Sequence, residues 1–205
     1  MKGDTPEAVL RDAFARARAG NLAPDLVRVV PGFCGERMRA FLHHLGQAGP
    51  RYLEVGIHRG ATFCSLLHGT PATGLAIDDW SQFGDHCEEF TDTCRRLLRP
   101  EQYTFIRADC WTVDLRDNVF DVLFYDADHA EDCQARALAH FRRWLAPVAI
   151  LIVDDWNWAH VRRGTAQGLL GYDVLAQEVE RTENEQDSAG WWNGVAAFVV
   201  RKRET

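Results

Sequence analysis

The fold is decided by residues 51–80, RYLEVGIHRGATFCSLLHGTPATGLAIDDW. Two short apolar runs, YLEV at 52–55 and GLAI at 74–77, flank a helix-like segment near 60–68. Each run has the length of a buried strand, and the segment between them has room for one short helix. A strand, a helix and a second strand in this order form a βαβ unit, whose two strands lie parallel in one sheet.

The same alternation continues toward the C-terminus. Further apolar runs lie at 103–106, 119–125, 148–153, 173–180 and 194–202, and helix-like segments lie near 86–98 and 130–145. A polar loop, TENEQDSAGWWN, separates the last two runs, so that they can pair as a hairpin. We therefore predict a doubly wound α/β domain over residues 49–205. Its mostly parallel, seven-stranded, Rossmann-like sheet is covered by helices on both faces.

Residues 1–48 are predicted to form a short N-terminal helical addition. Apolar residues at 9, 10, 14 and 17 share one face of a helix over 5–18, and a second helical pattern runs from about 34 to 47. These helices could pack between subunits, so a homodimer is one assembly that the sequence allows.

The composition is typical of a globular protein that acts on a small molecule. The chain has 205 residues, of which 46% are hydrophobic and 26% are charged, and its formal net charge is −7. This acidic balance disfavours a nucleic-acid partner. The longest fully apolar run, 148–153, is far shorter than the ~20 residues of a membrane span, and no secretory signal opens the chain. The six cysteines form no Cys-x-x-Cys pair, so we expect reduced thiols in a cytoplasmic protein.

Each of the first five predicted strands ends in at least one carboxylate, at the edge where open α/β sheets bind their ligands. After the first strand, Gly56 and Gly60 let the backbone approach a ligand, but the third glycine of the dinucleotide fingerprint is missing. Asp78 lies 22 residues beyond Gly56, the spacing at which a carboxylate accepts hydrogen bonds from ribose hydroxyls. Asp109 is placed to accept from an adenine amino group. The alternatives are a plain strand–helix turn after the first strand, a helix cap at Asp78 or Asp79, and a turn aspartate at Asp109.

A second acidic group follows the fourth and fifth strands. Neighbouring strands lie about 4.8 Å apart, so Asp126, Asp154 and Asp155 would crowd and repel one another. A bound divalent cation removes this conflict, and oxygen ligands favour Mg²⁺, Ca²⁺ or Mn²⁺. Asp128 and His129 are candidates to accept a proton. The alternatives are that Asp128 and Asp155 only cap helices, or that the acids bind substrate without a metal.

Five segments, taken in order, resemble the class I S-adenosylmethionine-dependent methyltransferases. They are LEVGIHRGATF at 53–63, GLAIDDW at 74–80, IRADC at 106–110, FYDADH at 124–129 and LIVDDWNW at 151–158. The last two look most like the branch that contains macrocin-type sugar O-methyltransferases and cephalosporin-hydroxylase-like proteins. The resemblance covers about residues 50–158 and is looser toward the C-terminus.

For the cofactor, the resemblance implies S-adenosylmethionine. In the family, residues matching Glu54, Gly56 and Gly60 hold its methionine portion, the position of Asp78 binds its ribose, and that of Asp109 contacts adenine. The predicted cofactor set is completed by neighbouring side chains: Asp79, Trp80, Cys110 and Asp126. His58 stands where many members have glycine, which makes the loop stiffer.

For the reaction, the resemblance implies methyl transfer to a hydroxyl of a sugar or of a glycosylated small molecule. The positions of Asp126, Asp154 and Asp155 ligate Mg²⁺ in the sugar methyltransferases, and that of Asp128 is their proposed general base. His129 is a second candidate for this base. Macrocin-type enzymes carry more N-terminal sequence over the substrate, so the shorter cover here leaves the substrate class open.

Tryptophans gather near the same strand ends. We predict Trp156, Trp191 and Trp192 as substrate contacts, because flat rings stack on the apolar face of a sugar; packing in the core is the alternative. Two other functions remain as alternative hypotheses. A non-catalytic S-adenosylmethionine-binding module is disfavoured by the intact acidic group, and a nucleotide-dependent oxidoreductase is disfavoured by the missing glycine.

Overall fold

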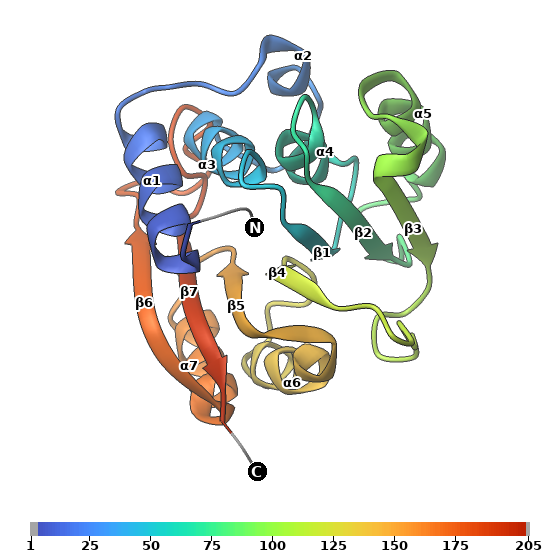
Figure 1. Cartoon of the computed structure of the whole chain (residues 1–205). Helices are drawn as coiled ribbons and strands as arrows, with labels where there is room; N and C mark the ends of the chain where they lie inside the picture. Colours follow the sequence, from blue (N-terminus) through green and yellow to red (C-terminus); the bar gives the residue numbers. More distant parts are fainter. Residues whose placement is uncertain (1–3, 204–205) are drawn as a thin grey trace.

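The structure, a computed structural model, describes residues 4–203 and contains a seven-stranded sheet in the order β3-β2-β1-β4-β5-β7-β6 (Figure 1). The strands are β1 (Arg51–Val55), β2 (Thr73–Asp78), β3 (Tyr103–Arg107), β4 (Phe120–Tyr125), β5 (Leu145–Val153), β6 (Tyr172–Glu180) and β7 (Val195–Lys202). β1 to β5 run parallel, and β7 pairs antiparallel with both β5 and β6. The predicted fold class and the C-terminal hairpin are therefore confirmed.

Helices cover both faces of this sheet (Figure 1). Those of the described residues are α1 (Pro6–Arg18), α2 (Asp25–Arg28), α3 (Glu36–Gly46), α4 (Ala61–Leu67), α5 (Cys87–Leu97), α6 (Glu131–Phe141) and α7 (Ala159–Gly168). One buried cluster joins α1, α3, α4 and α5 to one face of the sheet, and a second cluster joins α6 and α7 to the other. The domain is thus doubly wound, as predicted.

The central strand β1 shows how the sequence divides its side chains between the two cores. Tyr52 belongs to the cluster under α4, while Leu53 and Val55 belong to the cluster under α6. Successive residues of a strand point to opposite faces, and β1 has neighbours on both edges. A strand in this position is buried on both faces, which is why YLEV reads as a continuous run rather than an alternating one.

The helix predicted over 130–145 is shorter in the structure. α6 ends at Phe141, a 3₁₀ turn (Arg142–Trp144) follows, and β5 already begins at Leu145. Trp144 and Leu145 are both buried, so they continue the apolar helical period even though the chain has left the helix. Periodicity alone therefore placed the boundary four residues too late.

The N-terminal helices share a core with the sheet domain. Phe14 of α1 contacts Phe41 of α3, with 4.2 Å between the ring centroids, and stacks on Trp191 at 5.4 Å. The cluster around these rings also contains Tyr52 of β1. The division of the chain at residue 48 stays a prediction, but the side chains of both parts form one continuous packing unit.

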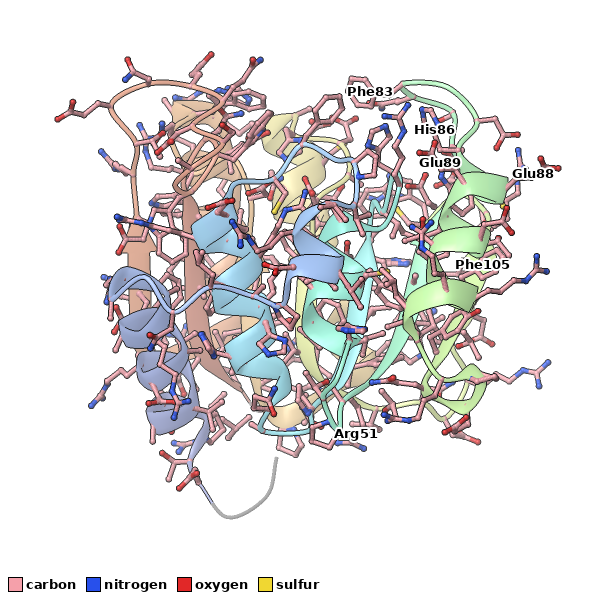
Figure 2. The ribbon with its side chains drawn as sticks, turned by 90° about the horizontal axis from the view of Figure 1, so that it is seen from above. Arg51, Phe83, His86, Glu88, Glu89 and Phe105 are labelled. Carbon is pink, nitrogen blue, oxygen red and sulfur yellow. The ribbon has the colours of Figure 1, made fainter. Side chains whose placement is uncertain are left out.

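The loops that follow β1, β2, β4 and β5 gather at one end of the sheet. Figure 2 shows Arg51, the first residue of β1, at one end of the molecule and Phe83, in the loop after β2, at the opposite end. No helix within residues 4–203 is long and apolar enough to cross a membrane.

Candidate functional site

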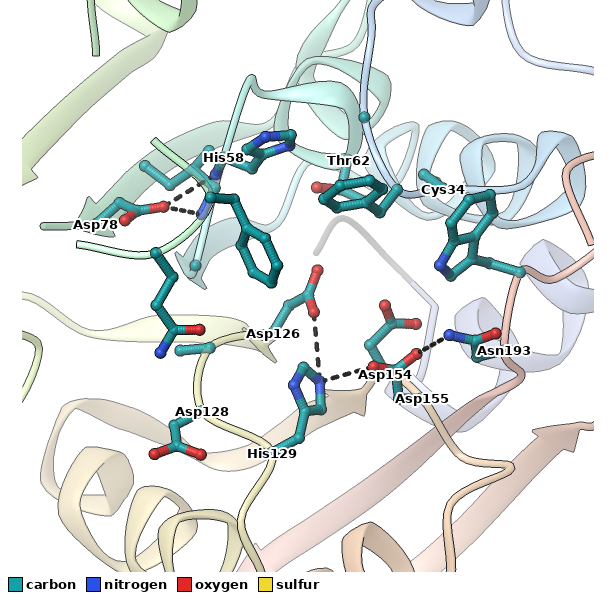
Figure 3. A pocket seen from close by; sticks show the side chains of 18 of the residues that line it. Cys34, His58, Thr62, Asp78, Asp126, Asp128, His129, Asp154, Asp155 and Asn193 are labelled. Atoms are coloured by element: carbon teal, nitrogen blue, oxygen red, sulfur yellow. Dashed lines mark hydrogen bonds and ion pairs between the residues drawn. The ribbon is translucent and has the colours of Figure 1, made fainter. Parts of the chain in front are cut away.

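A cavity of about 550 Å³ opens at the carboxyl ends of the parallel strands. Its lining comes from the loops after β1, β2, β4 and β5, from residues 32–34 before α3, and from the loop between β6 and β7. Figure 3 shows acidic side chains on its floor and aromatic rings above them. This is the position at which open α/β sheets bind ligands.

The loop between β1 and α4 is fitted closely against the end of β4. Gly56 has a φ of 87°, and a Cβ atom there would lie 2.0 Å from the backbone oxygen of Asp126. Gly60, with a φ of 86°, is the N-cap residue of α4. Only glycine combines this backbone angle with such an approach. The two glycines singled out in the sequence are therefore required by the geometry of the loop.

Asp78 fastens this loop to the end of β2. Its Oδ2 accepts hydrogen bonds from the backbone N–H groups of Ile57 and His58 at 2.7 and 2.9 Å, and its Oδ1 accepts from that of Trp80 at 2.7 Å (Figure 3). Asp78 does not cap a helix, because α5 begins only at Cys87. The carboxylate lines the cavity, so the residue predicted to bind ribose lies beside the glycine loop.

The neighbours of Asp78 also face the cavity. Asp79 lines it and accepts a hydrogen bond from the backbone N–H of Ser81 at 2.9 Å. Trp80, which has a φ of 53°, lines it as well and donates its indole N–H to the backbone oxygen of His58 at 2.8 Å. The loops after β1 and β2 are therefore linked by side chains at the end of β2 and just after it.

Glu54 lies behind the cavity wall rather than in it. Its carboxylate is fully buried and accepts hydrogen bonds from the hydroxyls of Tyr52 and Thr62. Thr62 itself lines the cavity, so one side chain separates Glu54 from the open space. Burial raises the pKa of Glu54 to about 8, because the charged form is poorly solvated there.

Asp126, Asp154 and Asp155 meet on the cavity floor, as the neighbouring strands β4 and β5 require. Burial raises the pKa of all three, and the charges of Asp154 and Asp155 add to this effect at Asp126. Asn193 donates to Asp155 Oδ1 at 2.7 Å. Among the described residues, Asp154 Oδ1 is buried with no hydrogen-bond partner.

His129 lies between two of these carboxylates. Its Nε2 is 3.5 Å from Asp126 Oδ1 and 3.4 Å from Asp155 Oδ2 (Figure 3). Burial lowers the pKa of His129, and the charge of Asp155 acts in the opposite direction. The imidazole is therefore held at the floor of the cavity, with a ring nitrogen facing both acids.

The donors on the floor match a hard divalent cation in kind but are not arranged around one. The three carboxylates, one of which carries the unpartnered Asp154 Oδ1, supply the kind of oxygen ligand that Mg²⁺ prefers. Within residues 4–203, however, no group of three or more His, Cys, Asp or Glu side chains is positioned to hold a metal ion. Side-chain rotation at the floor would be required for binding.

Asp128 lines the cavity beside His129 and stabilises a turn. Its Oδ1 accepts from the backbone N–H of Ala130 at 2.8 Å, and its Oδ2 accepts from the Cys133 thiol at 3.3 Å. The alternative that Asp128 and Asp155 only cap helices is wrong. α6 begins after Ala130 and α7 after Trp158, and neither helix has a side-chain cap.

Besides Glu54, five predicted residues lie outside the cavity lining: Gly60, Asp109, Cys110, Trp156 and Trp191. Asp109, just after β3, accepts from the backbone N–H of Trp111 at 3.0 Å, and Cys110 follows it. Trp156 packs edge-on against Phe198, and Trp191 is 3% exposed in the core beside α1. Of the three predicted substrate tryptophans, Trp192 lines the cavity.

Several lining residues were not predicted from the sequence. Phe33, Cys34, Phe83, Trp158, His160 and Gln186 line the cavity. One structural signal marks this region, namely backbone strain. Of the seven non-glycine residues with positive φ in the described chain, six line the cavity: His58, Trp80, Phe83, Asp155, Gln186 and Trp192. Such strain is typical of functional sites.

Solved structures with this fold include proteins with bound cofactor. Cofactor-bound Rv0187 from MTB has 19% identity and a TM-score of 0.61, and the match covers 99% of this chain and 93% of that one. The O-methyltransferase TomG from Streptomyces achromogenes, in complex with SAM, has 16% identity and a TM-score of 0.62, with coverages of 96% and 91%. An O-methyltransferase from Bacillus cereus, in complex with SAH, has 15% identity and a TM-score of 0.57, with coverages of 96% and 92%.

These likenesses concern the fold, because the identities are low. A search of curated protein sequences gives no match. A sequence family described as a methyltransferase domain matches residues 53–156, just over half of the chain. This segment runs from β1 to just past β5 and includes the glycine loop, Asp78 and the acidic floor. The chain belongs to this family of methyltransferase domains and has the class I, Rossmann-like methyltransferase fold.

Proposed function

We propose that the protein transfers the methyl group of S-adenosylmethionine to a hydroxyl group of a small molecule. The observation that carries this proposal is one continuous cavity that joins the glycine loop held by Asp78 to the floor that carries His129. A cofactor on the loop and an acceptor on the floor would therefore share one space. Two solved structures with this fold are O-methyltransferases in complex with SAM or SAH.

The cofactor would lie along the loops after β1 and β2. The loop that Gly56 and Gly60 shape would hold its methionine portion, and Asp78 and Asp79 would offer carboxylate oxygens to the ribose hydroxyls. A carboxylate has about four lone-pair sites, of which Asp78 uses three within the chain. The adenine contact proposed for Asp109 and Cys110, and the direct contact proposed for Glu54, stay predictions.

His129 is the residue that we propose as the general base. Bound S-adenosylmethionine supplies an electrophilic methyl group, so the chain must align the hydroxyl oxygen and remove its proton. His129 lines the cavity, and among the described residues its Nε2 has no hydrogen-bond partner; Asp126 and Asp155 lie 3.5 and 3.4 Å from this nitrogen and hold the ring. Both carboxylate oxygens of Asp128 accept hydrogen bonds within the chain, which leaves Asp128 less suited to this role.

We also propose that Asp126, Asp154 and Asp155 would hold a divalent cation such as Mg²⁺. The donor chemistry and the unpartnered Asp154 Oδ1 favour such an ion, although the three carboxylates, as they stand within residues 4–203, are not positioned around one. A bound divalent ion lowers the pKa of a hydroxyl that it touches. The sugar acceptor, the homodimer and the cytoplasmic location stay predictions.

Calorimetric titration of the full chain with S-adenosylhomocysteine, with Mg²⁺ and again with EDTA, tests the proposal. Micromolar binding is expected, and an Asp154→Asn variant should retain it while its affinity for Mg²⁺ falls. Methyl transfer is then measured with a methyl glycoside and with 1,2-dihydroxybenzene as acceptors, in the wild type and in His129→Gln. Binding without transfer to any acceptor would favour the non-catalytic module, and binding of NAD(H) alone would favour an oxidoreductase.

A further inference from the structure

His58 is the residue of the loop between β1 and α4 that lines the cavity and can carry a positive charge. Within residues 56–60, the cavity is lined by residues 56–58, and the other two of these are glycine and isoleucine. The Nδ1 atom of His58 is buried and has no hydrogen-bond partner among the described residues. Arg59 lies outside the cavity lining, and its guanidinium pairs with Glu89 of α5 at 3.0 Å.

The imidazole ring of His58 is held in place by its neighbours. It stacks on Phe33, with 4.9 Å between the ring centroids and 4° between the planes, and His86 meets it edge-on at 4.7 Å. The segment before Phe33 is anchored by the buried Arg39, whose guanidinium donates to the backbone oxygens of residues 27 and 30 at 2.8 Å each. A ligand that binds the imidazole would therefore lose little binding free energy to ordering it.

Two other side-chain donors near His58 are already used within the chain. The hydroxyl of Thr62 donates to the carboxylate of Glu54, and the indole N–H of Trp80 donates to the backbone oxygen of His58. Figure 3 shows His58 and Thr62 on the side of the cavity away from His129. On this side, the imidazole of His58 keeps a nitrogen without a partner in the described chain.

The formal charges of the cavity lining are otherwise acidic. Six carboxylates line it: Asp78, Asp79, Asp126, Asp128, Asp154 and Asp155. No lysine or arginine within residues 4–203 belongs to the lining. These acids suit the ammonium and sulfonium groups of S-adenosylmethionine, but they would repel the carboxylate of its amino-acid portion unless a donor met it. The other lining histidines, His129 and His160, belong to the loop after β4 and to α7.

We infer that His58 binds the carboxylate of the amino-acid portion of S-adenosylmethionine through an imidazole N–H. This inference rests on the proposed function, because it requires the cofactor to lie on the loop between β1 and α4. Burial lowers the pKa of His58, and the charges of His86 and Arg59 act in the same direction, against those of Asp78 and Glu89. The ring of the free chain is therefore neutral and donates one N–H. A carboxylate beside it would favour the protonated ring, which gives a stronger, charge-assisted hydrogen bond.

Calorimetric titration of the full chain with two ligands tests the inference. One ligand is S-adenosylhomocysteine, and the other is its decarboxylated analogue, which keeps the amine and lacks only the carboxylate. The wild type should bind S-adenosylhomocysteine about tenfold more tightly than the analogue, the scale of one hydrogen bond to a charged group. His58→Phe keeps a ring that can stack on Phe33 but removes the N–H donor. Its affinity for S-adenosylhomocysteine should fall about tenfold, while its affinity for the analogue should stay within about twofold of the wild-type value.

The matched control is His160→Phe, which makes the same substitution at a histidine that lines the cavity from α7. Both affinities should stay unchanged in this variant. Failure of the wild type to bind both ligands would refute the proposed function itself. If the ligands bind, the inference alone is overturned when the wild type binds the analogue as tightly as S-adenosylhomocysteine, a comparison that requires no variant. It is also overturned when His58→Phe leaves the affinity for S-adenosylhomocysteine unchanged or lowers both affinities equally.

Discussion

Replacing Asp78 with asparagine tests whether this carboxylate holds the glycine loop in place. The asparagine carbonyl oxygen can still accept from the N–H groups of Ile57 and His58, as Asp78 Oδ2 does. The side-chain amide would then face the N–H of Trp80, where Oδ1 now accepts at 2.7 Å. Two donors would oppose each other, and one hydrogen bond to a charged group would be lost.

The expected cost follows from this geometry. A hydrogen bond to a charged group contributes about 1.5–3 kcal/mol. Because Asp78 is half-buried, water can in part replace it as the acceptor for the Trp80 N–H. We expect Asp78→Asn to lower the free energy of unfolding by about 2 kcal/mol. Asp78→Ala leaves three N–H groups without their acceptor and should cost about 4 kcal/mol. Affinity for S-adenosylhomocysteine should fall in both variants, because the loop geometry is lost with the contact.

Urea unfolding measures the first effect, with a midpoint shift of roughly 1 M for about 2 kcal/mol. Asp79→Asn is the matched control, because it makes the same chemical change one residue away. Asp79 is exposed and accepts a hydrogen bond from one backbone N–H, that of Ser81. Asp79→Asn should therefore change the free energy of unfolding by no more than about 0.5 kcal/mol. Equal stabilities of the two asparagine variants would refute the claim that Asp78 organises the loop.

Three further predictions concern the core around the site. Gly56→Ala should destabilise by at least about 3 kcal/mol in urea unfolding, because the new Cβ would lie 2.0 Å from a backbone oxygen at a φ of 87°. The pKa of Glu54 in the folded chain, about 8, lies above its unfolded value, so the wild type should lose stability as pH rises from about 4.5 to 8. In Glu54→Gln, the free energy of unfolding should depend less on pH over that range. Arg39→Met should cost about 2–4 kcal/mol and increase hydrogen exchange over residues 25–35, because two carbonyl oxygens lose their donor. Unchanged exchange there would contradict the role given to Arg39.

The sequence was informative where regular structure dictates position. Parallel strands end at the same edge of a sheet, so acids placed at the ends of β2, β4 and β5 had to converge there. Asp78, Asp126 and Asp155 were all predicted at this edge for that reason, and all three line the cavity. The strand runs were recognisable because a central strand is apolar on both faces.

The aromatic rings of Phe33 and Phe83, which line the cavity, could not be placed there by the same reasoning. Phe33 lies in an irregular stretch before α3, and no periodicity relates it to the loops after β1 and β2. Trp191 and Trp192 show the same limit. They are adjacent, yet one is buried beside α1 and the other lines the cavity. The positive φ of Trp192 turns the chain between them, and a sequence of ordinary L-residues gives no warning of that turn.

The sequence offered Asp78 either as a ribose ligand or as a helix cap, and the structure gives it a third task, which is to hold the glycine loop. This task is compatible with the first. Three of about four lone-pair sites serve the backbone, and the carboxylate still faces the cavity. The loop is therefore already ordered by contacts within the chain. A ligand that binds there would lose little binding free energy to ordering the loop. The same side chain would then fix the loop and complete the cofactor site, which is why its substitution should affect stability and affinity together.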